Sequence, residues 1–170
     1  KDENYPKSMN THLHILEPYT NLYRVWKDEY LAGQIKKLIR SFLDHIVDGE
    51  TFHFKLFFEK NWELKSQIVS YGHDIEGAWL LTEAAEMIGD QVLLEEVQQI
   101  ALKMTKATIV EGSDSDCSLF YERDLKTDHF DADKHWWPQA EAMIGMVNAY
   151  QISGDEKYLD SSMRVWKFIK

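Results

Sequence analysis

The sequence predicts an all-α protein made of three helical hairpins, with short β-ribbons in the loops between the hairpins. Apolar residues recur at three- and four-residue steps along most of the chain, which is the period of an amphipathic helix. Short joints at Asp28, Asp90 and Asp155 each end one helix and begin the next, and they recur at nearly equal intervals. Longer loops, over residues 49–71 and 111–135, separate the pairs and carry short β-like runs. A repeated helical hairpin of this kind is typical of a helical array or toroid.

The first helix is expected over residues 9–25, where Ile15, Leu22 and Val25 supply apolar positions. Pro18 lies inside this range. A proline in a helix interior loses one hydrogen bond and clashes with the preceding turn, at a cost of about 3 kcal/mol. We therefore expect a kink or a broken start in this helix.

The other five helices follow from the same period and from capping residues. A glycine precedes the Asp of the second and third joints, and glycine is the usual residue that ends a helix. The expected starts are Asp28, Asp74, Asp90, Pro138 and a position near Asp155, with apolar positions that reach Val47, Ile88, Met104, Tyr150 and Ile169 respectively. Residues 52–59 and 119–122 are expected to form small hairpins or ribbons that decorate one end of the helices.

Composition and charge exclude several classes of protein. The chain has 170 residues, 44% of them hydrophobic, which is enough for a core, and a formal net charge of −10. This acidic balance argues against nucleic acid or an anionic membrane as a partner. No apolar stretch approaches the roughly 20 residues of a membrane span. The one cysteine, Cys117, permits no internal disulfide and fits a reducing compartment, so we expect a cytoplasmic protein.

The two ends of the chain suggest a fragment. It begins at Lys1 without a Met, and it stops at Lys170 inside an amphipathic run that has no capping residue after it. We therefore expect one partial domain over residues 1–170, with apolar seams left open where further helices would pack. Such seams favour self-association of the chain.

A polar stripe marks the first helix of the first pair. Asn10, His14, Glu17 and Asn21 fall on one side of a helix among leucines, which predicts either a solvated face or a set of groups held for a site. His12 lies on the other side of such a helix, so His12 and His14 cannot share a metal ion there.

A second cluster opens the third helix. His73 and Glu76 are three residues apart and face the same way, so the carboxylate can orient the imidazole and raise its pKa, as an acid/base residue needs. The alternative is a plain helix start in which Asp74 and Glu76 favour the helix dipole. His53 and His129 lie in loops, and the sequence indicates no partner for either.

A third cluster opens the fifth helix. Pro138 suits a first helical turn, which leaves Trp136 and Trp137 at its mouth. Such a pair is either core or a platform for the apolar face of a sugar ring. All three clusters lie at the same end of the first helix of a pair, and in a toroid these ends converge on one cavity.

The residues of the three clusters resemble the acylglucosamine 2-epimerase superfamily, and more closely its cellobiose and mannobiose 2-epimerase branch. The resemblance rests on KSMNTHLHILE (7–17), SYGHDIE (70–76) and KHWWPQAEA (134–142), in this order. The Asp after His73 and the Gln-Ala after Pro138 are similar to the disaccharide branch. The resemblance implies an (α/α)6 barrel, of which the three hairpins would form about half.

The resemblance also implies a role for each cluster. His73 would be one of two acid/base histidines that act at C2 of the reducing-end sugar, with His14 holding the ring or the intermediate oxygens and Glu76 supporting the imidazole. The residues implied in sugar binding are Asn10, one of Trp136 and Trp137, and Asp2. No metal and no cofactor is implied.

The implied reaction is epimerisation of a β-1,4-linked disaccharide or oligosaccharide, such as cellobiose or mannobiose. Ring opening exposes the carbonyl, a base removes the C2 proton to give an enediolate, and a second group returns a proton on the opposite face. The resemblance places the second histidine beyond Lys170, so we expect this chain alone to be inactive.

Two other functions remain open. Another (α/α)6 enzyme, a glycoside hydrolase, would use two carboxylates, for which Glu17, Glu76 and Glu141 are candidates. A non-catalytic sugar-binding helical module would rely on the tryptophan pair.

Overall fold

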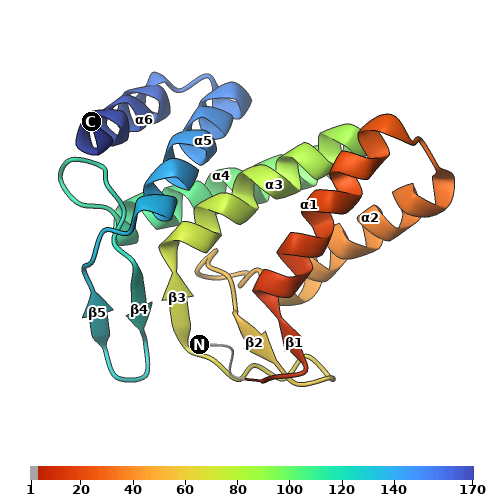
Figure 1. Cartoon of the computed structure of the whole chain (residues 1–170), viewed down its shortest axis with the longest axis horizontal. Helices are drawn as coiled ribbons and strands as arrows, with labels where there is room; N and C mark the ends of the chain where they lie inside the picture. Colours follow the sequence, from red (N-terminus) through yellow and green to blue (C-terminus); the bar gives the residue numbers. More distant parts are fainter. Residues whose placement is uncertain (1–3) are drawn as a thin grey trace.

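Three helical hairpins form the body of the structure, as the sequence predicts. The structure is a computed structural model that describes residues 4–170, and within them six α-helices follow one another in pairs (Figure 1). The pairs are α1 (Met9–Val25) with α2 (Glu29–Ser41), α3 (Tyr71–Ile88) with α4 (Gln91–Gly112), and α5 (Trp136–Ser153) with α6 (Glu156–Ile169).

The three Asp joints cap helices as expected. Asp28 accepts a hydrogen bond from the Leu31 N–H at 2.8 Å, and Asp90 and Asp155 cap α4 and α6 in the same way. Gly89 and Gly154 end α3 and α5 with positive φ angles of 72° and 70°. Glycine adopts this left-handed conformation without the steric cost that a Cβ would add.

Three expectations about helix starts differ from the structure. Helix α5 begins at Trp136 rather than at Pro138, so Trp136 and Trp137 are its first two residues. Helix α3 begins at Tyr71 rather than at Asp74, so Asp74 lies within the first turn and is buried instead of stabilising the helix end from solvent. Helix α1 runs without a break through Pro18, so the expected broken start is wrong. Pro18 is exposed, and water can therefore satisfy the carbonyl group that lacks its helical donor.

The strands tie distant segments together rather than forming only local hairpins. Strand β1 (Lys7–Ser8) pairs with β2 (Phe57–Phe58), and both pairings in the sheet of β3 (Ile68–Ser70), β4 (Glu122–Asp124) and β5 (His129–Asp131) are antiparallel as well. Within one loop, β4 pairs with β5, mostly beyond the expected run 119–122, and Phe58 of β2 forms an isolated antiparallel bridge with Leu64. Strands β1 and β2 lie on either side of the first helical pair in the chain, and β3 and β4 lie on either side of the second. The strands gather at the end where α1 and α3 begin (Figure 1).

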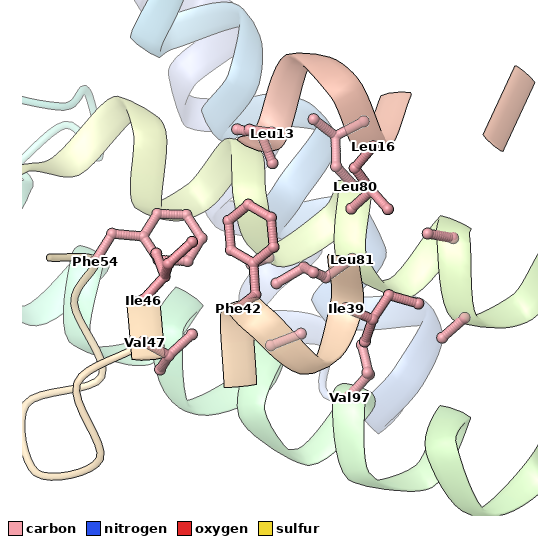
Figure 2. Packing of buried hydrophobic residues seen from close by; sticks show 14 of the residues in the cluster. Leu13, Leu16, Ile39, Phe42, Ile46, Val47, Phe54, Leu80, Leu81 and Val97 are labelled. Atoms are coloured by element: carbon pink, nitrogen blue, oxygen red, sulfur yellow. The ribbon is translucent and has the colours of Figure 1, made fainter. Parts of the chain in front are cut away.

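Helices α1, α3 and α5 lie side by side, and α3 also contacts α2 and α4 (Figure 1). The larger core fills the space between the first two pairs. Figure 2 shows Leu13 and Leu16 of α1 above Leu80 and Leu81 of α3, with the Phe42 ring beside these two residues. A smaller core joins α3 to the third pair; it includes Ile75, Ala142, Met146 and Val165.

Apolar side chains are exposed along the two outer edges of this array. On the first pair they are Leu22, Val25, Trp26 and Tyr30, and on α6 they are Leu159, Met163, Trp166, Phe168 and Ile169. We call these sets the first-pair edge and the α6 edge. In the part of the chain that the structure describes, no helix is both long and apolar enough to cross a membrane.

Candidate active site

The polar stripe of α1 lies next to the first turns of α3 and α5. Ser8 caps α1 through the Thr11 N–H, so the stripe begins with Asn10 in the first turn. His14 Nδ1 and Glu17 Oε2 are 3.6 Å apart, and both side chains are about half exposed. His12 turns away, with Nδ1 donating to the Ser8 carbonyl at 2.7 Å, so the two histidines do not face each other, as the helical period predicts.

His73 stands in the first turn of α3 and is mostly buried. Its Nδ1 is 2.7 Å from the Ser70 Oγ, and its ring centroid is 4.8 Å from that of Trp137. Burial, together with the charge of nearby His14, lowers the pKa of His73 to about 4. The expectation that Glu76 raises the pKa of this imidazole is wrong, because burial dominates and the hydrogen-bonded neighbour is Ser70.

The two tryptophans have different surroundings. Trp136 is 80% exposed, whereas Trp137 packs on the first turn of α3 beside His73. A Cβ at Gly72 would lie 2.6 Å from the Trp137 ring, so only glycine permits this contact. The structure therefore brings Trp137, rather than Trp136, next to the candidate base.

Three carboxyl groups, from α1, α3 and α5, face the same region. Burial, with the charges of Glu141 and Glu17, raises the pKa of Glu76 to about 7. Burial also raises the pKa of Glu141, whose Oε2 accepts a hydrogen bond from Trp79 Nε1 at 2.8 Å. From the sequence, Glu141 is a candidate only for a hydrolase, and Trp79 is not a candidate. The four-residue spacing from Trp137 to Glu141 is one helical turn, and it could have indicated that the two residues share a helix face.

A pocket of about 460 Å³ opens beside His73. Its lining includes Asn10 from α1, Ser70 and His73 at the start of α3, and Tyr121 and Glu122 from the second long loop and β4. Met9, Leu56, Phe57 and Ile68 add apolar surface, so the pocket is of mixed character; it lies at the end where the helices begin and is large enough for a sugar ring. Asp2, the remaining expected contact, lies outside the described residues.

His53 has partners, contrary to the expectation from sequence. Its Nδ1 is 2.7 Å from Asp74 Oδ2, and its Nε2 is 3.3 Å from Glu111 Oε2. These residues are far apart in the sequence, so their spacing gave no indication of the contact. None of these three residues is among those that line the pocket.

Replacing Glu76 by glutamine should stabilise this chain at pH 8 and change its stability little at pH 4. The pKa of Glu76 is about 7 in the folded protein, against an ordinary value of 4.5. A carboxyl group with a raised folded pKa favours folding below pH 4.5, and this contribution is lost as the pH rises to 7. We expect a gain of about 1–2 kcal/mol at pH 8, measured by urea unfolding.

Glu86, which is exposed on the same helix, supplies the control. Glu86→Gln removes an exposed carboxyl group and measures the effect of the substitution itself at both pH values. A Glu76→Gln variant whose stability differs from that of the parent chain by the same amount at pH 4 and pH 8 would contradict the raised pKa.

Comparison with known proteins places this arrangement in a family. The model of the family N-acylglucosamine 2-epimerase (GlcNAc 2-epimerase) matches residues 1–170. A cellobiose 2-epimerase of Bacteroides fragilis is 50% identical over 170 residues, which are 100% of this chain and 43% of that protein.

Solved structures agree with this result. The cellobiose 2-epimerase of Bacillus thermoamylovorans has a TM-score of 0.93 and 38% identity, over 99% of this chain and 43% of that one. A sugar epimerase from a ruminal bacterium has a TM-score of 0.92 and 38% identity, over 97% of this chain and 42% of that one. The chain thus spans less than half the length of these relatives, and its three hairpins correspond to about half of an (α/α)6 barrel. The chain belongs to the N-acylglucosamine 2-epimerase family.

Proposed function

We propose that residues 1–170 form one partial domain that supplies one wall of the active site of a longer sugar 2-epimerase. The substrate would be a β-1,4-linked disaccharide, such as cellobiose or mannobiose, with inversion at C2 of the reducing-end sugar. The observation that carries this proposal is the placement of His73, which is mostly buried and neutral at pH 7, beside Trp137 and at the pocket. The relatives named cellobiose 2-epimerase support the same reaction class.

His73 is proposed as the base that acts at C2. With a pKa of about 4 the ring is unprotonated at neutral pH. If Nδ1–H donates to the Ser70 Oγ, the lone pair of Nε2 is left free to accept the C2 proton once ring opening has exposed the carbonyl. A low pKa makes the free imidazole a weak base, so stabilisation of the enediolate oxygens must supply much of the rate.

His14, Glu76 and Asn10 are proposed to hold the oxygens of the open-chain sugar. His14 and Asn10 are exposed along α1 and can donate to these oxygens. Glu76, whose pKa of about 7 leaves it partly protonated at neutral pH, can donate a proton to a sugar oxygen or accept one from it. Trp137 would stack on the apolar face of the ring. A second acid is needed on the opposite face of C2, and we expect it from the longer protein.

The test is incubation of the longer protein with cellobiose in D2O. Epimerisation predicts a product of unchanged connectivity, with mannose at the reducing end and deuterium at C2. The interacting carboxyl groups of Glu76 and Glu141 are the observation that favours a glycoside hydrolase. Such an enzyme would release monosaccharides instead. Saturable binding without either product would favour a sugar-binding module. The 170-residue chain alone should give no turnover.

We also propose that this chain on its own self-associates through its apolar edges. The first-pair edge and the α6 edge expose large apolar side chains, Trp166 at 40% and Met163 at 51% among them. Patches of this kind drive association in water. Light scattering after size exclusion should give a mass above that of the monomer, and Trp166→Glu with Met163→Glu should lower it. A monomeric parent chain would contradict this proposal.

We place this activity in the cytoplasm. The supporting observation is that Cys117, the one cysteine of the sequence, is buried and free. Cell fractionation of the source organism would test the location.

A further inference from the structure

A buried pair of ionisable side chains, His53 and Asp74, lies outside the pocket and has no part in the proposed chemistry. The His53 side chain is 5% exposed and that of Asp74 is 0% exposed. His53 Nδ1 lies 2.7 Å from Asp74 Oδ2, and the Phe54 N–H donates to Asp74 Oδ1 at 2.7 Å. Each Asp74 oxygen therefore accepts one hydrogen bond from the loop between α2 and α3, Oδ2 from His53 and Oδ1 from Phe54. A charged pair buried so completely needs a structural or functional reason.

Two glycines allow close packing of neighbouring segments against α3 near this pair. A Cβ at Gly77 would lie 2.1 Å from the Phe54 ring, and a Cβ at Gly112 would lie 2.3 Å from the Tyr71 ring. The loop is thus packed against α3 at one side of Asp74, and the end of α4 is packed against it at the other. These contacts restrain the first turn of α3.

The start of α3 lacks the side-chain cap that most helices of this chain have. In α1, α2, α4 and α6 the residue before the helix accepts a backbone N–H, but Ser70 makes no such bond. Its Oγ contacts His73 instead. The orphan N–H groups of an uncapped helix start favour fraying, so another restraint is required.

Helix α5, which carries Trp137, has the same arrangement. It also lacks a side-chain cap, and buried Gln139 bonds both to the Leu119 N–H and to the Leu119 carbonyl at 2.8 Å. The helices that carry His73 and Trp137 are therefore each tied to the preceding loop by one buried polar side chain within the first turn. In α3 that side chain is Asp74, and its neighbour in sequence is His73.

We propose that Asp74 and His53 are positioning residues for His73, which they act on by fixing the first turn of α3 through contacts outside the pocket. Successive residues of a helix point about 100° apart, so Asp74 can bond to the loop while His73 faces the pocket. Loss of the pair would let the first turn loosen and His73 become hydrated, without removal of any group that touches the sugar. This inference rests on the proposed function only for its effect on catalysis.

The first test uses the 170-residue chain and requires no activity. The His73 pKa, about 4 in the parent chain, is measured by NMR titration of its ring Cε1–H signal. In Asp74→Asn it should rise by at least one unit towards 6.5, because hydration favours the charged ring. Removal of a nearby negative charge would by itself lower the pKa of His73, so a rise reports loosening and not electrostatics.

Two substitutions at His53 refine the test. His53→Phe keeps the ring volume and loses the donor, so it should also raise the pKa of His73. His53→Asn retains an N–H donor close to the Nδ1 position and should largely restore the parent value. His129→Phe makes the same chemical change at an exposed histidine and is the control.

The second test uses the longer protein and its epimerase activity. Asp74→Asn should lower kcat about 10- to 100-fold with little change in KM, since small displacements of a catalytic group have effects of this size. If the unsubstituted longer protein epimerises no disaccharide, the proposed function fails while the NMR test still decides the positioning role. A folded Asp74→Asn chain, by circular dichroism, whose His73 pKa is unchanged would overturn the proposal. If His53→Phe does not fold, Asp74→Asn and His53→Asn decide it.

Discussion

Substitution of His73 by alanine in the longer protein should abolish epimerisation and exchange of the C2 proton with solvent. His73 is mostly buried and has a pKa of about 4, so its imidazole ring is neutral beside the pocket at physiological pH, as the proposed base must be. Loss of a positioned general base costs about 10²- to 10⁴-fold in rate. Deuterium incorporation at C2 of cellobiose, followed by NMR, measures the exchange step separately from overall turnover.

The control for this experiment is His129→Ala, which removes an exposed histidine on β5 and should leave exchange unchanged. Retained exchange in His73→Ala would reject the assignment of the base. Loss of epimerisation with retained exchange would mean that His73 is not the group that removes the proton.

Gly145→Ala should destabilise the chain by about 2–3 kcal/mol, because it overpacks the contact between α3 and α5. A Cβ at Gly145 would lie 2.4 Å from Ile75 Cγ1 and 2.9 Å from the Ile75 carbonyl oxygen. A backbone atom of a packed helix cannot move aside as a side-chain end can, so the two helices must separate. Urea unfolding followed by circular dichroism measures the loss.

Gly33→Ala is the matched control, because it makes the same change within α2 at a position with nothing within 4 Å. Alanine there should stabilise the chain by about 0.5–1 kcal/mol through helix propensity alone. Equal effects at Gly145 and Gly33 would contradict the close packing of α3 on α5.

The sequence predicts the helices well and the strand pairing poorly, for a physical reason. Period and caps are local signals, so the joints at Asp28, Asp90 and Asp155 mark the three hairpins correctly. The partner of a strand is not a local property. The run 52–59 contains β2, which bridges to Leu64 inside its own loop as expected, but the strand that pairs with β2 is β1 from before α1.

The candidate site shows the same division. Helical spacing places Asn10, His14 and Glu17 on one stripe, and the repeat brings this stripe near His73 and Trp137. Bonds between segments far apart in sequence were missed, as in the contacts of Trp79 with Glu141 and of His53 with Asp74. The pKa of His73 was predicted in the wrong direction, since burial cannot be read from two neighbouring residues.

The strands that bracket the first two helical pairs have a consequence for the order of folding. Strands β1 and β2 enclose α1 and α2 in the chain, and β3 and β4 enclose α3 and α4. Helical pairs form early because their contacts are close in sequence, whereas strands about fifty residues apart must first close a large loop. Each strand pair can therefore form only after its helical hairpin has become compact, and it then stabilises that hairpin. The pocket is lined by residues of these strands, so it should be among the last parts of the chain to form and among the first to unfold.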